Sequence, residues 1–267
     1  MPPSVLEREY SPSSMLGGDI SDYIAIYAER SAAARRNFPC REDLRYGPEP
    51  AQVLDFFPAA SPDAPLFVFI HGGYWQELSH KESAPMAPQL LEAGFAFATL
   101  NYTLAPKATL AVMIEEIARA LRFLREGASD LGFDPRRITL SGHSAGAHLA
   151  AMHIMRKGSP FANNGLEHLL LLSGIYDLEP ITLTSINEPL RLSAAQARAL
   201  SPMFLTPVIH PRVTVAVAER DTREFRRQSK DFALHLGRQG LAVRQLLVAG
   251  RNHFDIILDP GFALATY

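Results

Sequence analysis

The pentapeptide Gly-His-Ser-Ala-Gly at 142–146 constrains the fold more than any other part of the chain. It follows a short apolar run, 137–141, with the character of a strand, and precedes a segment, 147–153, with the character of the start of a helix. Glycines on both sides of Ser144 permit a strand-to-helix turn that is too sharp for larger side chains and that strains the serine backbone. The pattern therefore predicts that the Ser144 hydroxyl projects over the carboxyl edge of a parallel sheet.

Apolar runs of strand length alternate with amphipathic stretches of helix length along most of the chain. The spacing of apolar residues predicts helices over 113–126 and 225–239, and a helix is also expected over 19–34. Several strand candidates are too uniformly apolar to leave one face in water. This alternation predicts an α/β fold, a mostly parallel sheet with helices on both faces. The strand candidates are 66–70, 95–100, 138–140, 169–172, 213–217 and 243–248, with 53–57 expected as an edge strand.

Composition bounds the number of domains and the classes of partner. The chain has 267 residues, 47% of them hydrophobic, which is enough for one large core. We expect one domain over 1–267, with a cover segment at 1–48 and a cap insertion at 178–207. A net charge of −2 creates no field that gathers nucleic acid or an anionic membrane. Without an apolar run of about 18 residues or a secretory signal, we expect a cytoplasmic protein with a small-molecule partner, and leave a homodimer open.

The single cysteine, Cys40, excludes an internal disulfide and a cluster of thiolate ligands for a metal ion. No histidine lies near it in the sequence, so we expect an inert thiol.

A serine nucleophile needs a base to accept its proton and an acid to orient that base. Asp221 follows the strand candidate 213–217, and His253 lies in the loop after the last strand candidate. Both residues leave the carboxyl ends of strands, at the edge where the turn presents Ser144. We therefore expect Ser144, Asp221 and His253 to form a catalytic triad.

Other residues compete for the acid and base positions. Glu219 lies two residues before Asp221, and Asp177 follows the strand candidate 169–172. Asp255 is expected to adjust the histidine loop rather than to complete the triad. The weaker candidates for the base are His148 and His153 on the helix after the turn, and His210 at the opposite end of the sheet.

Backbone amides should stabilise the oxyanion that forms when Ser144 attacks a carbonyl, by about 3 kcal/mol each. One donor is expected to be the amide of Ala145, because amides at the start of a helix are unpaired. The others are expected to be Gly73 and Tyr74 in the segment His-Gly-Gly-Tyr-Trp, 71–75, because paired glycines let a loop pass close under the substrate oxygen.

Aromatic side chains next to these amides could form the substrate pocket. Tyr74 and Trp75 are expected to wall it and to stack on an aromatic leaving group, and His143 is expected to contact substrate. The alternative for Trp75 is a buried core position.

These motifs resemble the α/β-hydrolase superfamily, in the branch that includes hormone-sensitive-lipase-like esterases and kynurenine formamidases (arylformamidases). The segment 71–75 is similar to the formamidases, since it lacks the further glycine typical of the lipase-like esterases. Similarity extends over about residues 7–257. The resemblance implies an α/β-hydrolase fold, Ser144 as nucleophile with Asp221 and His253, and an oxyanion hole around Gly73. The other segments that carry it are 102–106, 142–149, 173–178 and 221–229.

The expected reaction is a two-step acyl transfer from a small amide or ester through Ser144. An aryl formamide such as N-formylkynurenine is the favoured substrate, because a formyl group needs little acyl space. No metal or organic cofactor is required by this chemistry. The alternatives are a general short-chain carboxylesterase and, more remotely, a non-catalytic protein that binds a small molecule.

Overall fold

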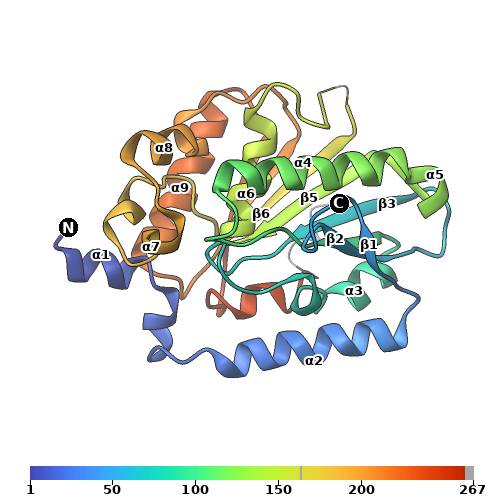
Figure 1. The fold of residues 1–267 in the computed structure, drawn as a ribbon, viewed down its shortest axis with the longest axis horizontal. Coiled ribbons are helices and arrows are strands. Elements are labelled where there is room, and N and C mark those ends of the chain that lie inside the picture. The colour runs from blue at the N-terminus through green and yellow to red at the C-terminus, as the bar shows by residue number, and fades with distance from the viewer. Residues whose placement is uncertain (163, 262–267) are drawn as a thin grey trace.

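An eight-stranded sheet forms the centre of the protein (Figure 1). The computed structural model describes residues 1–162 and 164–261. The strand order is β1-β2-β4-β3-β5-β6-β7-β8; β1 and β2 pair antiparallel with their neighbours, and the strands from β4 to β8 are parallel. The strands are β1 Arg41–Arg45, β2 Val53–Phe57, β3 Ala64–Ile70, β4 Ala96–Leu100, β5 Phe133–His143, β6 Leu166–Leu172, β7 Arg212–Ala218 and β8 Val243–Val248.

Helices cover both faces of the sheet, which confirms the predicted α/β fold. One buried cluster joins the sheet to α4, α6 and α9, and a second joins the other face to α2, α3 and η5. Figure 1 shows α4 and α6 above the sheet and α2 and α3 below it. The α-helices are α1 Pro3–Glu9, α2 Ser21–Asn37, α3 Ala87–Glu92, α4 Leu110–Glu126, α5 Ala128–Leu131, α6 Ala145–Met155, α7 Asn187–Leu190, α8 Ala194–Ala199 and α9 Arg223–Arg238. The 3₁₀ turns are η1 Pro12–Leu16, η2 His80–Glu82, η3 Pro180–Leu183, η4 Pro202–Phe204 and η5 Asp255–Ile257. Among the described residues, no helix is both long enough and apolar enough to cross a membrane.

The edge of the sheet differs from the sequence prediction. We expected 53–57 at the edge, but β2 is buried at all five positions and lies inside, with β1 outside it. β1 has four exposed positions out of five and pairs with β2 mainly through its backbone. A strand of this kind has no apolar alternation, so the sequence gives no signal for it.

Capping side chains set the starts of the two long helices on the upper face. Thr109 accepts a hydrogen bond from the amide of Val112, and α4 begins three residues before the predicted 113–126. Thr222 accepts from the amide of Phe225 at the start of α9. Threonine satisfies otherwise unpaired amides at a helix start, and this local bond outweighs the apolar spacing in fixing the boundary.

The turn between β5 and α6 has the sharp geometry predicted for Ser144. The φ and ψ of Ser144 are 54° and −118°, a conformation that non-glycine residues rarely adopt. A Cβ on Gly146 would lie 2.0 Å from the carbonyl oxygen of Ile70, and one on Gly142 would lie 2.2 Å from the carbonyl oxygen of Gly146. The helix therefore packs directly on the backbone of β3, and only glycine fits at these two positions.

We expect Gly146→Ala to lower the free energy of unfolding by at least about 2 kcal/mol, because the new methyl group must displace strand backbone. Gly237→Ala is the matched control: a Cβ there meets nothing within 4 Å, so alanine should stabilise α9 by about 0.5–1 kcal/mol. Urea denaturation of both variants measures the difference. Equal stabilities for the two variants would contradict the packing described for the turn.

Two histidines on α6 are buried in the core. His148 Nε2 lies 2.8 Å from the carbonyl oxygen of Leu200, whereas neither ring nitrogen of His153 has a hydrogen-bond partner among the described residues. Burial is the main cause that lowers the pKa of His148 to about 4 and that of His153 to about 3. Both side chains are neutral at pH 7 and contribute to packing.

The depressed pKa of His153 predicts acid sensitivity. Below the unfolded value of about 6.5, the unfolded chain binds a proton that the folded chain excludes until about pH 3, so stability falls as the pH falls. We expect His153→Leu to reduce the loss of stability between pH 7 and pH 5 by about 2 kcal/mol. Met152→Leu on the same helix should leave that loss unchanged. Parallel pH profiles for wild type and His153→Leu would contradict the prediction.

Candidate active site

A cavity of about 270 Å³ opens where the parallel strands end, and Ser144 and His253 both line it. Parallel strands bring their carboxyl ends to one edge, so residues far apart in sequence meet there. Ser144 follows β5, and Gly72 and Gly73 follow β3. The described lining also contains Ser11, Pro12, Ser13, Ile20, Ile24, Tyr27, Phe69, His71, Tyr74, Gln76, Glu77, Leu78, Glu82, Ser83, His143, Ser185, Ile186, Phe254 and Ile257.

His253 and Asp221 form the predicted imidazole–carboxylate pair. Nδ1 of His253 lies 3.0 and 3.1 Å from the two carboxylate oxygens of Asp221, and both side chains are buried. The loops that carry them leave the neighbouring strands β7 and β8 and are joined by a hydrogen bond from the amide of Arg220 to the carbonyl of Arg251. Nδ1 faces the carboxylate, which leaves Nε2 as the nitrogen available to accept a proton.

Ser144 and His253 meet at the cavity without a direct hydrogen bond. No hydrogen bond joins the Ser144 hydroxyl to the His253 ring within the described part of the chain, although both side chains border the same space. Hydrogen bonds between nucleophile and base are often long before substrate binds and tighten in the reacting complex. The arrangement is compatible with proton transfer from Ser144 to His253.

His143 supports the histidine loop. Its Nε2 lies 2.8 Å from the carbonyl oxygen of His253, and the two ring centroids are 4.7 Å apart. Burial, reinforced by the nearby His253, lowers the pKa of His143 well below its usual range. The neutral ring donates to the His253 backbone and also borders the cavity, so it can both position the loop and contact a substrate.

The loop after β3 carries unpaired amides beside Ser144. A Cβ on Gly72 would lie 3.1 Å from the Cβ of Ser144, so the loop passes directly against the serine. Within residues 1–162 and 164–261, the amides of Gly73, Tyr74 and Ala145 donate no hydrogen bond. Gly73 and Tyr74 have φ values of 93° and 49°, the left-handed region that exposes successive amides. Three amides without a hydrogen bond among the described residues therefore lie close to Ser144.

Trp75 does not wall the pocket, contrary to expectation. Its side chain is 0% exposed and is absent from the cavity lining. The ring packs edge-on against His148, with centroids 5.2 Å apart, in the core above the sheet. The φ of Trp75 is 61°, in the left-handed region like those of Gly73 and Tyr74 before it, which the sequence pattern cannot show.

The competing acids have other partners. Glu219 accepts a hydrogen bond from the amide of Gly250, and Asp177 accepts from the amide of Glu179. Asp255 accepts from the amide of Asn252 at 2.7 Å, which shapes the loop before His253 as expected. None of these three carboxylates contacts the His253 ring among the described residues, which leaves Asp221 as its partner.

Sequence reasoning missed several residues of the cavity wall. Ile20 and Ile24, near the start of α2, and Ser185 and Ile186, between η3 and α7, line the cavity. The regions 1–48 and 178–207 were expected to supply a cover, but no motif marks the individual side chains.

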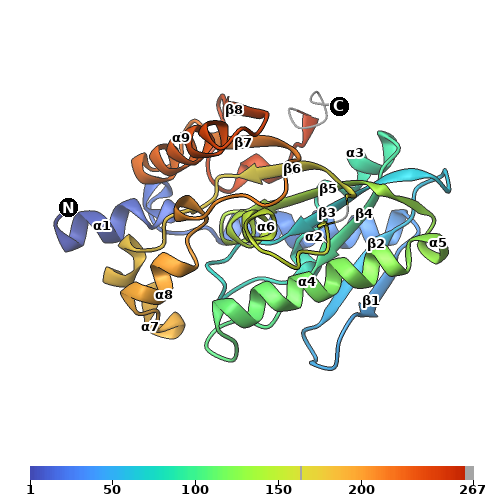
Figure 2. The same cartoon turned by 90° about the horizontal axis from the view of Figure 1, so that it is seen from above.

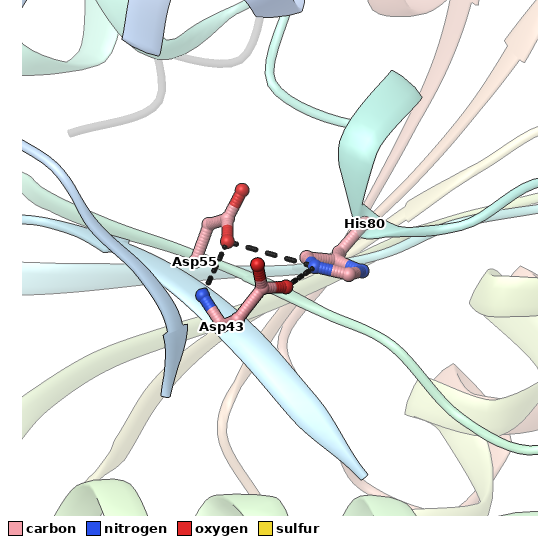
Figure 3. Close-up of side chains that lie close together, drawn as sticks. All are labelled: Asp43, Asp55 and His80. Carbon is pink, nitrogen blue, oxygen red and sulfur yellow. Dashed lines mark hydrogen bonds and ion pairs between the residues drawn. The ribbon is translucent and has the colours of Figure 1, made fainter. Parts of the chain in front are cut away.

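Asp43, Asp55 and His80 lie close together at the β1 edge and are the one group in the described chain with the spacing of metal ligands (Figure 3). His80 Nε2 lies 2.8 Å from Asp43 Oδ1 and 3.6 Å from Asp55 Oδ1. Lys81 Nζ already contacts both carboxylates at 3.0 and 3.1 Å, and Arg35 lies 3.4 Å from Asp55. With two cations bound, these carboxylates form a partly buried ion-pair network that fixes η2 to the sheet, and they do not suit a further cation.

Cys40, the single cysteine, is half-buried next to this network. Burial, followed by the charge of Asp55, raises the pKa of the Cys40 thiol to about 12. The protonated thiol is unreactive, as expected.

Fold and site together define a hydrolase of the α/β-hydrolase class. A protein from Silicibacter sp. TM1040 assigned as a thioesterase has the same fold, with a TM-score of 0.88 and 26% identity over 97% of both chains. A family model described as BD-FAE matches residues 54–171.

Sequence relatives identify the family of hydrolases to which the chain belongs. The chain is 35% identical to the kynurenine formamidase of Salmo salar and 35% identical to that of Danio rerio, in each case over 94% of this chain and 89% of the relative. The chain belongs to the kynurenine formamidase family.

We expect Asp221→Asn to lower kcat by about 10⁴-fold, because an amide at this position favours the wrong tautomer of His253 and cannot stabilise its cation. Asp231→Asn on α9 tests the same chemical change at an exposed site and should leave kcat unchanged. Steady-state hydrolysis of p-nitrophenyl acetate measures both variants. An Asp221→Asn enzyme with kcat within tenfold of wild type would contradict the assignment of the acid.

Proposed function

We propose that the protein hydrolyses an aryl formamide, with Ser144 as nucleophile, His253 as base and Asp221 as the acid that orients it. The observation that carries this proposal is the His253–Asp221 pair at 3.0 Å beside a serine held in the strained turn. His253 accepts the Ser144 proton as the hydroxyl attacks the carbonyl, and it then returns the proton to the leaving amine. Water repeats the sequence on the acyl-enzyme and releases the acid.

The amides of Gly73, Tyr74 and Ala145 would hold the oxyanion. They are unpaired and surround the serine, and the Ala145 amide lies at the positive end of α6. Donors already fixed in place need no reorganisation as the charge develops, and each contributes about 3 kcal/mol. Main-chain donors therefore supply the stabilisation of charge that the reaction needs.

The cavity suits a small acyl group and a larger aromatic leaving group. Gly72 lies against Ser144, and the cavity lining includes the apolar side chains of Ile24 and Phe254. Glu77 and Glu82 line the cavity, while none of its described lining residues is a lysine or arginine. This charge favours a leaving group with an ammonium, as in an α-amino acid, and the relatives' names point to the same substrate class.

A general carboxylesterase is the second candidate. A relative named esterase LipQ from Mycobacterium tuberculosis is 33% identical over half of this chain. The same triad and oxyanion donors would cleave an ester, so the leaving-group pocket is what separates the two activities. A cytoplasmic location, a single domain and a cap insertion over 178–207 stay predictions from the sequence, and the homodimer stays open.

We expect kcat/KM for N-formyl-L-kynurenine to exceed that for p-nitrophenyl acetate, although the ester is chemically the easier substrate. The reason is that only the formamide fills the aromatic pocket and gains its binding energy in the transition state. Ser144→Ala should abolish both activities. An ester preference of about 10³-fold or more would end the formamidase proposal and favour the carboxylesterase.

A further inference from the structure

The segment 7–13, which we call the N-terminal strap, contacts several parts of the candidate site. It joins α1 to η1, and α1 lies beside α9 in both views of the fold (Figures 1 and 2). Ser11, Pro12 and Ser13 line the cavity, and Glu7 accepts a hydrogen bond from the amide of Ser185 at 3.0 Å. The strap thus forms part of the cavity wall and, through Glu7, supports the segment that carries Ser185.

Two consecutive carbonyl groups of the strap hold the two sides of the catalytic apparatus. The Glu9 carbonyl accepts a hydrogen bond from Oγ1 of Thr222 at 2.6 Å, and the Tyr10 carbonyl accepts one from the hydroxyl of Tyr74. Thr222 directly follows Asp221, and its amide donates to Asp221 Oδ1 at 3.2 Å. The amide of Tyr74 is one of the proposed oxyanion donors.

The strap is itself firmly anchored to α9. The Tyr10 hydroxyl donates to Glu224 Oε2 at 3.0 Å and accepts from Gln228 Nε2 at 2.8 Å. The Glu9 carboxylate accepts from the amide of Arg223 at 3.0 Å. Tyr10 is 1% exposed, so these bonds are shielded from water and costly to lose.

Tyr74 needs such a restraint because its backbone is strained. A φ of 49° is sparsely populated for a tyrosine and persists only where surrounding contacts hold it. The bond from the Tyr74 hydroxyl to the Tyr10 carbonyl supplies one such contact. Catalytic geometry tolerates little error, and a displacement of about 1 Å can cost about 10²-fold in rate.

We infer that the N-terminal strap sets the position of the acid Asp221 and of the oxyanion donor Tyr74 relative to Ser144, with Tyr10 and Thr222 as positioning residues. Neither residue touches the reacting atoms; both act through the adjoining loops. This inference rests on the proposed triad, but not on the identity of the substrate. It therefore holds for an ester as well as for a formamide.

The first test compares Thr222→Val with Thr222→Ser. Valine keeps the shape and removes the hydroxyl that donates to Glu9, whereas serine restores both that donor and the cap of α9. The substrate is p-nitrophenyl acetate, and a fluorophosphonate counts the active sites. We expect Thr222→Val to lower kcat per site about tenfold and to leave KM within about twofold of wild type. Thr222→Ser should match wild type. Thr182→Val removes an equivalent hydroxyl-to-carbonyl bond away from the cavity and should leave kcat unchanged.

The second test is a double-mutant cycle with Tyr10→Phe, which releases the strap from Glu224 and Gln228 but keeps the ring. If the strap acts as a unit, the rate loss of the double variant is smaller than the product of the single losses. Multiplicative losses, or thermal destabilisation with kcat per site within twofold of wild type, would overturn the inference. If Thr222→Val fails to fold, Tyr10→Phe alone decides: a lower kcat per site supports the inference, and a kcat per site within twofold of wild type overturns it. Labelling that persists in Ser144→Ala would instead refute the proposed triad.

Discussion

Contact between backbone and backbone at the turn after β5 is the constraint on which the site depends. Gly146 rests on the carbonyl of Ile70, and Gly142 faces the carbonyl of Gly146. These contacts leave no room for a side chain at either glycine. This contact sets the axis of α6, and with it the direction of the Ser144 hydroxyl and of the free Ala145 amide. It also brings the loop after β3 against the serine, because β3 and β5 are neighbours in the sheet.

Given this turn, parallel pairing places the remaining groups. β7 and β8 end side by side, so Asp221 and His253 leave the sheet at the same edge as Ser144. Their buried hydrogen bond would be costly to lose, since the remaining partner would be left without a bond in a low-dielectric site. His143 holds the histidine loop from the serine side, and the N-terminal strap holds the acid loop from the other. Each proposed catalytic group is therefore held by the sheet and by a second element.

The sequence predicted what local patterns determine. The strands β3, β4, β6 and β7 were found because they are buried on both faces at nearly every position, and the turn was found because its glycines mark a close approach. β1 was missed because an exposed strand paired mainly through its backbone carries no apolar alternation. Trp75 was misplaced because three successive residues with positive φ, Gly73, Tyr74 and Trp75, set the course of the loop without leaving a sequence signal. The bonds of Glu9 and Tyr10 to residues more than sixty positions away arise from tertiary packing alone, so no spacing rule could have revealed them.

The most direct measurement is a crystal structure of the enzyme after reaction with a fluorophosphonate, which converts the nucleophile into a tetrahedral mimic of the oxyanion. The account predicts a phosphorus bonded to Ser144 Oγ, one phosphoryl oxygen within about 3 Å of the amides of Tyr74 and Ala145, and His253 Nε2 beside the serine oxygen. A phosphoryl oxygen that points away from these amides, or a phosphorus on any other residue, would contradict it.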